Sequence, residues 1–174
     1  MRRLIAAIAA SILVTTPATA DETSSLTSLM TAYEARGWEG VGRLNIGFSG
    51  MCTGALVSPR HVLTAAHCIY NPRTGEQISP DDIEFLAGWR NGRASAYRNV
   101  RRAIAHPDYE YTGPEGDLRV ANDIALLELA SPIQLANIRP FETADRPRKG
   151  SKVGVVSYAH DLSLIHISEP TRLD

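Results

Sequence analysis

The chain has 174 residues and a mass of 18.9 kDa, which suits one domain or an incomplete pair of lobes. Hydrophobic residues make up 44% and charged residues 21%, a balance that excludes a disordered, collagen-like or transmembrane chain. The 18 Lys and Arg nearly balance the 19 Asp and Glu, so the formal net charge is only -1. Because no global charge attracts an anionic partner, we expect no nucleic acid and no membrane surface among its partners.

The first twenty residues are typical of a cleaved secretory signal peptide. Arg2 and Arg3 precede an apolar run from Leu4 to Val14, and the segment ends in Ala18-Thr19-Ala20. The alternative, a membrane anchor, needs about 20 apolar residues, which is more than this run provides. We therefore expect residues 1–20 to be removed and the mature protein to be secreted or periplasmic, free of the membrane.

Residues 21–40 are polar at first and then place Leu26, Leu29, Met30 and Tyr33 at helical spacing, which predicts a short amphipathic helix or a pro-segment. From residue 41 the pattern changes to short β-favouring runs separated by Gly, Pro, Asn and Asp, which predicts an all-β sandwich or barrel. The last run follows a Pro- and charge-rich stretch, 140–150, that we interpret as a hinge. The predicted strands are 41–46, 54–57, 62–63, 83–89, 96–104, 124–129 and 153–158.

The two cysteines, Cys52 and Cys68, lie 16 positions apart. An oxidising compartment would let them form a disulfide, whereas a protein that is not exported would keep two free, buried thiols.

Two short motifs carry the functional prediction. Thr64-Ala65-Ala66-His67-Cys68 follows the first cysteine, and Asn122-Asp123-Ile124-Ala125-Leu126-Leu127 comes later in the chain. Together they resemble the histidine and aspartate segments of trypsin-like (chymotrypsin-fold) serine proteases. The resemblance covers roughly residues 41–160. No Ile-Val-Gly-Gly-like start precedes it, which favours the bacterial glutamyl-endopeptidase-like branch.

The resemblance implies an all-β, chymotrypsin-like double β-barrel. Residues 41–139 would form the first barrel, and residues 140–161 the hinge and the start of the second. His67 would be the general base and Asp123 the carboxylate that orients it, while Cys52 and Cys68 would form the disulfide. The substrate would be a polypeptide, and neither a metal ion nor an organic cofactor is required.

The nucleophilic serine that such a protease needs is missing from the expected part of the chain. No Gly-x-Ser-Gly motif follows Asp123, and the one match, Gly47-Phe48-Ser49-Gly50, precedes His67 in the wrong order. We therefore expect a fragment of a serine endopeptidase that is inactive as written. The alternative is a non-catalytic protease homologue that serves as a binding module. The late serines that lack the motif are Ser131, Ser151, Ser157, Ser163 and Ser168.

The tail offers a reason for the missing segment. Residues Leu162 to Arg172 match, in order, the in-frame translation of a transposase-type sequencing adapter. We expect residues 162–174 to be derived from such an adapter, and we assign no function to them.

Some tempting residues receive structural interpretations. His61 and His106 are predicted to be turn residues. An arginine cluster could bind a polyanion or supply the binding-module surface, but a solvated hairpin is the favoured interpretation. Its members are Arg90, Arg93, Arg98, Arg101 and Arg102.

Overall fold

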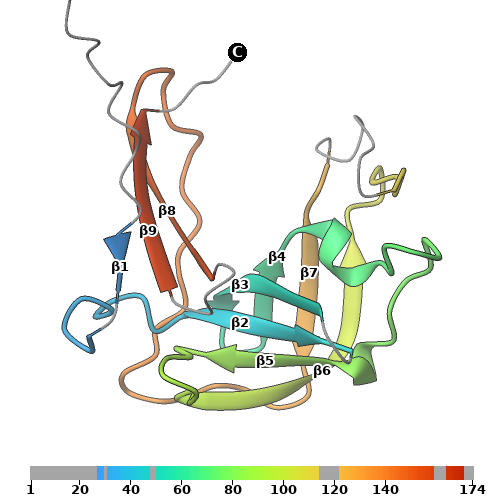
Figure 1. Ribbon diagram of the computed structural model, residues 1–174, viewed down its shortest axis with the longest axis horizontal. Helices are drawn as coiled ribbons and strands as arrows, with labels where there is room; N and C mark the ends of the chain where they lie inside the picture. The colour runs from blue at the N-terminus through green and yellow to red at the C-terminus, as the bar shows by residue number, and fades with distance from the viewer. Residues whose placement is uncertain (1–26, 30, 48–49, 114–121, 159–163, 171–174) are drawn as a thin grey trace, which may run out of the picture.

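The computed structural model describes residues 27–29, 31–47, 50–113, 122–158 and 164–170. Six antiparallel strands close into a barrel in the order β2-β3-β4-β7-β6-β5, and three others form a separate sheet in the order β1-β9-β8 beside one end of it (Figure 1). The predicted all-β barrel fold is confirmed. The barrel strands are β2 (Val41–Ile46), β3 (Gly50–Ser58), β4 (His61–Thr64), β5 (Ile83–Ala87), β6 (Ala96–Ala105) and β7 (Ala125–Leu129).

The remaining elements are short. Two 3-10 turns, η1 (Ala66–Ile69) and η2 (Pro80–Asp82), interrupt the connection between β4 and β5. The second sheet contains β1 (Thr27–Ser28), β8 (Lys152–Tyr158) and β9 (Leu164–Pro170), with β8 antiparallel to β9. β9 lies within the predicted adapter-derived tail, whose origin stays a prediction. Among the described residues, no helix is long and apolar enough to cross a membrane.

Alternation of side chains along the strands fills the barrel. In β7, Ala125, Leu127 and Leu129 are buried while Leu126 is exposed, as expected for a strand with one face inward. The interior is also crowded at the cross-strand pair Gly42 and Gly54. A methyl group on Gly42 would lie 2.3 Å from the Phe85 ring, so the aromatic ring occupies the space that a side chain would need.

A second apolar cluster connects the barrel to the other sheet. Leu29, Val41 and Tyr158 are buried together, with both tryptophans packed around them. The Tyr158 backbone N–H donates to Thr53 Oγ1 at 2.9 Å, and the Tyr158 hydroxyl donates to the Trp89 carbonyl at 2.8 Å. These contacts hold the end of β8 against β3 and against the segment that follows β5.

The helix expected between residues 26 and 33 does not form in the described part of that segment. Thr27 and Ser28 pair with β9 instead, and residues 31–37 form a turn with a single i to i+4 bond from the Ala35 N–H to the Thr31 carbonyl (3.1 Å). Gly37, with φ 88°, leaves the helical conformation at once. The pro-segment interpretation stays a prediction.

The prediction of a turn was wrong for His61 and correct for His106. His61 is the first residue of β4, half-buried, with Nδ1 2.7 Å from Ser58 Oγ. It is in a strand because it pairs with Glu128 of the adjacent strand β7. At His106, the carbonyl accepts a hydrogen bond from the Tyr109 N–H at 2.9 Å, which closes the expected turn.

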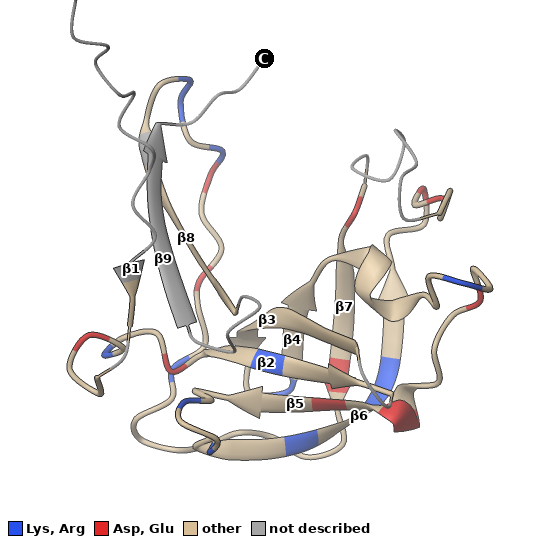
Figure 2. Ribbon diagram, viewed as in Figure 1, with Lys and Arg blue, Asp and Glu red and all other residues tan. Residues whose placement is uncertain are grey.

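The arginine cluster is spread along a hairpin and β6 (Figure 2). A β-bulge near Val100 breaks the alternation, so Arg101 and Arg102 are both exposed and both pair with Glu128. The Arg98 guanidinium donates to the Pro132 carbonyl at 3.2 Å. Because a carboxylate and a carbonyl already engage three of these guanidiniums, the cluster is not a uniform anion-binding surface.

Candidate active site

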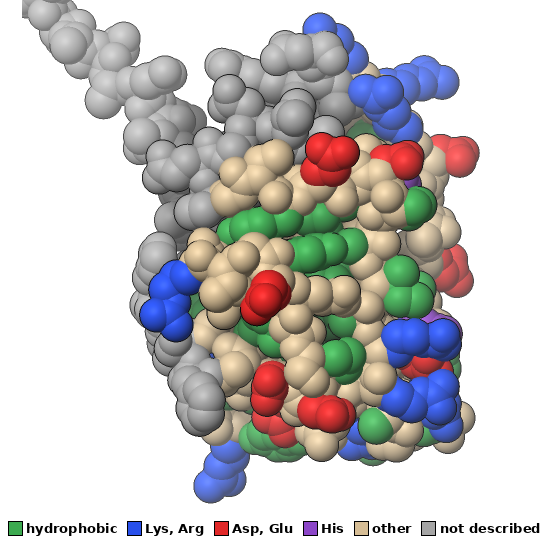
Figure 3. All heavy atoms as spheres, turned by 90° about the vertical axis from the view of Figure 1, so that its right-hand side faces the viewer, with side chains coloured by type: hydrophobic (Ala, Val, Ile, Leu, Met, Phe, Trp, Pro, Cys, Tyr) green, Lys and Arg blue, Asp and Glu red, His purple; other side chains and the backbone are tan. Residues whose placement is uncertain are grey.

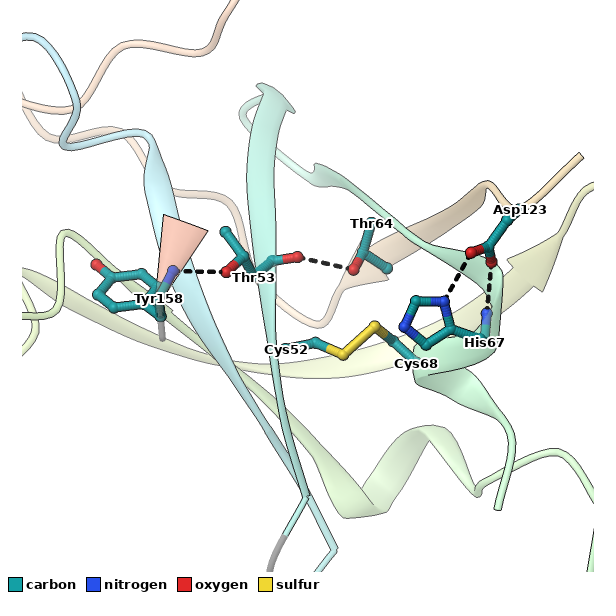
Figure 4. Close-up of a disulfide and its surroundings, with 7 residues drawn as sticks. All are labelled: Cys52, Thr53, Thr64, His67, Cys68, Asp123 and Tyr158. Atoms are coloured by element: carbon teal, nitrogen blue, oxygen red, sulfur yellow. Dashed lines mark hydrogen bonds and ion pairs between the residues drawn. A yellow bond between two sulfur atoms is a disulfide. The ribbon is translucent and has the colours of Figure 1, made fainter. Parts of the chain in front are cut away.

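His67 lies in η1, directly after β4, and two ties fix this turn to β3. The Cys52–Cys68 disulfide joins the strand to the residue after the histidine, with the Cα atoms 6.2 Å apart (Figure 4). Three residues before the histidine, at the end of β4, the buried Thr64 hydroxyl donates to the Thr53 carbonyl at 2.8 Å. The backbone is thus tied to the barrel both before and after His67, while the His67 side chain remains 40% exposed.

Asp123 reaches this turn from the adjacent strand, because it lies just before β7, whose first residue, Ala125, pairs with Thr64 at the end of β4. Its Oδ1 accepts the His67 backbone N–H at 2.8 Å, and its Oδ2 lies 2.7 Å from His67 Nδ1. An ionised carboxylate can only accept hydrogen bonds, so Nδ1 must be the protonated ring nitrogen. In the neutral imidazole the lone pair is then on Nε2. The fold brings together the two residues that sequence analysis paired, although 56 positions separate them.

The other face of His67 borders a cleft of about 800 Å³. The disulfide and the loop from Tyr70 to Ser79 line it, and Tyr111 closes one side by stacking on Tyr70 with ring centroids 5.4 Å apart. Figure 3 looks onto this side of the molecule, where hydrophobic side chains gather in the middle and charged side chains of both signs stand around them. The cleft is large enough to receive an extended peptide segment beside the imidazole.

The same corner holds three potential metal ligands. Atoms of Cys52, His67 and Cys68 lie within 4.8 Å of one another. Cysteine binds metals as the thiolate, and both sulfur atoms here are bonded to each other. In this oxidised state the donor set does not fit a metal ion, and the imidazole is the reactive group of the corner.

The serines considered in the sequence lie in different parts of the fold. Ser131 follows β7, Ser151 precedes β8, Ser157 is in β8, and Ser168 is in β9. Ser49 and Ser163 lie outside the described residues. Sequence analysis did not identify the supporting residues Thr53, Thr64 and Tyr158. In the sequence, the one hint of the hydrogen bond from Thr64 to Thr53 was the threonine that precedes Ala65-Ala66-His67.

Comparisons with known proteins agree with this geometry. The family model described as Trypsin matches residues 31–164. The trypsin of Phaedon cochleariae is 37% identical over 91 residues, which cover 51% of this chain and 31% of that protein. Chymotrypsin-C of Bos taurus is 33% identical over 101 residues, covering 58% and 33%, and the complement C1r-B subcomponent of Mus musculus is 38% identical over 86 residues, covering 47% and 12%.

A solved structure shares the fold. The crystal structure of the scabies mite inactivated protease paralogue S-D1 matches with a TM-score of 0.62 and 15% sequence identity, covering 83% of this chain and 60% of that one.

The matches to the three curated relatives cover only about an eighth to a third of the length of those proteins. The specific link to the bacterial glutamyl-endopeptidase branch stays a prediction. From the family match, the paired motifs and the barrel, the chain belongs to the trypsin family of serine proteases.

Proposed function

We propose that the protein is an exported serine endopeptidase, and that this chain carries the general base and its orienting carboxylate but not the nucleophile. The observation that supports this most directly is the double contact between Asp123 and His67 at 2.7 and 2.8 Å. One carboxylate fixes both the backbone and the ring of the histidine, which sets the tautomer that a general base needs.

The chemistry follows the serine-protease scheme described for this family. His67 Nε2 takes the proton from a serine hydroxyl as the serine oxygen attacks the peptide carbonyl carbon. Asp123 stabilises the imidazolium that results. The imidazolium then gives the proton to the amine nitrogen as the peptide C–N bond breaks, leaving an acyl-enzyme. Water, deprotonated by the same nitrogen, hydrolyses the ester and restores the serine.

The serine would come from a segment that this sequence lacks. The three curated relatives compared above extend well beyond the matched region. We propose that residues 1–20 are a signal peptide, that residues 140–161 begin a second barrel, and that residues 162–174 replace the native continuation. On this account the chain as written does not hydrolyse peptides.

Sequencing the source DNA with long reads, from a library made without transposase adapters, provides the full gene for the test. We expect the frame to depart near codon 162 and continue to a Gly-x-Ser-Gly motif. The expressed full-length protein should hydrolyse a casein substrate, and His67→Ala should remove that activity. A full-length protein without such a serine, or activity that survives His67→Ala, would contradict the proposal.

The matched control for this assay is His61→Ala. His61 is a half-buried histidine of the same hairpin that bonds to Ser58 Oγ and has no contact with Asp123 in the structure. Its substitution should leave hydrolysis intact. Retained activity in this variant shows that the loss in His67→Ala comes from the imidazole and not from general damage to the hairpin.

A further inference from the structure

Asn122, the residue before Asp123, has an unusual backbone conformation. Its φ is 56°, in the left-handed region, which side chains other than glycine and asparagine rarely adopt. The Asn122 carbonyl accepts the Ile124 N–H at 2.7 Å, so three residues form a tight turn centred on Asp123. The turn sets the direction in which the chain delivers the aspartate to β7.

The neighbouring turn holds this one in place. The Asn122 side-chain amide donates to the Asp108 carbonyl at 3.3 Å. On the other side of Asp123, the Ile124 carbonyl accepts the His106 N–H at 2.8 Å. Residues 106–109 therefore support the backbone both before and after the aspartate.

The placement of Asp123 depends on this support. The side chains of Ala125, Leu127 and Leu129 face the barrel interior, whereas Asp123 lies in the tight turn just before β7. Its carboxylate must nonetheless meet two separate donors on His67 at once. A small rotation of the backbone at residue 122 would move the carboxylate away from at least one of them.

We propose that Asn122 is a positioning residue, whose left-handed backbone holds the Asp123 carboxylate on His67. The role rests on the proposed function, because the histidine–aspartate contact matters only if the histidine acts as a base. Asn122 touches no reacting atom and acts only through Asp123.

Native-state hydrogen exchange on the whole chain tests this, since the His67 amide is protected by Asp123 Oδ1 and reports directly on the contact. Alanine is strained in the left-handed region. The strain is large enough to shift the equilibrium between the native turn and a relaxed backbone by about five- to thirtyfold. We expect Asn122→Ala to accelerate exchange of the His67 amide by about that factor. Core amides such as that of Leu127 should change much less. Asn122→Gly, which tolerates the conformation but loses the side-chain bond to Asp108, should exchange at His67 more slowly than Asn122→Ala and no more slowly than the wild type.

A matched control comes from the same chain. Asn91, in the exposed turn between Arg90 and Arg93, also has a left-handed backbone, with φ 48°. Asn91→Ala carries the same kind of strain far from the site and should leave the His67 amide unchanged. The proposal is overturned if Asn122→Ala leaves His67 exchange unchanged, if the His67 and Leu127 amides accelerate equally, or if Asn122→Gly behaves like Asn122→Ala.

A further variant separates this proposal from the proposed function. Asp123→Ala removes the acceptor, so it should accelerate exchange of the His67 amide at least as much as Asn122→Ala does. If Asp123→Ala leaves that amide protected, the histidine–aspartate contact itself is wrong and the proposed function loses its main support. If Asp123→Ala accelerates exchange and Asn122→Ala does not, only the role of Asn122 is refuted.

Discussion

Removing the Cys52–Cys68 disulfide should destabilise the barrel by an amount that the loop size sets. The bond closes a separation of 16 residues between β3 and η1. In the chain-entropy model a loop of this size contributes about 3 kcal/mol to the free energy of unfolding. Urea slopes for small proteins are about 1 to 3 kcal/mol/M, so the midpoint of unfolding should fall by about 1 to 3 M.

The assay is urea unfolding of the Cys52→Ala/Cys68→Ala double variant, followed by the fluorescence of the two tryptophans. A dithiol reductant serves as the internal control. It should lower the midpoint of the wild type toward that of the double variant and leave the variant itself unchanged. An unchanged midpoint in the variant would refute the reasoning, as would a wild type that the reductant does not affect.

Three further predictions concern packing and titration. Gly42→Ala should lower the free energy of unfolding by about 1 to 3 kcal/mol through overpacking against Phe85, and Phe85→Leu should recover part of that loss in a double-variant cycle measured by urea unfolding. Hydrogen bonding from Arg102 lowers the pKa of Glu128. The stability that ionised Glu128 adds to the fold is therefore present above the ordinary carboxyl pKa and is lost as pH falls through the lowered value. Glu128→Gln should therefore reduce the Tm near pH 7, and the difference from the wild type should vanish in acid and shrink in 1 M salt. Burial raises the pKa of the Tyr158 hydroxyl, so this tyrosine stays protonated between pH 9 and 11.5. Tyr158→Phe should therefore leave the amplitude of tyrosine ionisation, followed by ultraviolet absorbance over this range, unchanged. A smaller amplitude in the variant would contradict the prediction.

Much of the barrel could be predicted because its strands follow a local rule. Val41–Ile46 was predicted with the bounds that the structure shows, since Leu44 and Ile46 alternate with polar residues and a glycine flanks each end of the run. His67 and Asp123 could be predicted because each lies in a distinctive motif. Their meeting requires only that the end of β4, before His67, pairs with the start of the antiparallel β7, after Asp123.

The failures arose where distant pairing decides local structure. Thr27 and Ser28 form a strand because β9 lies beside them, and nothing in the helical spacing around them indicates that partner. His61 is in a strand because Glu128 lies opposite, although the preceding Ser-Pro-Arg favours a turn. The left-handed backbone of Asn122 likewise depends on the turn at residues 106–109, which the sequence pattern does not connect to it.

The most direct test of the central claim is labelling of the full-length protein with a fluorophosphonate, which reacts with an activated serine. We predict a single labelled serine, located beyond Asp123 in a segment that this chain lacks. Labelling should be lost in His67→Ala and should be absent in the 174-residue chain. Labelling that persists in His67→Ala, or a full-length protein with no labelled serine, would contradict the assignment of His67 and Asp123 as the base and orienting acid of a serine endopeptidase.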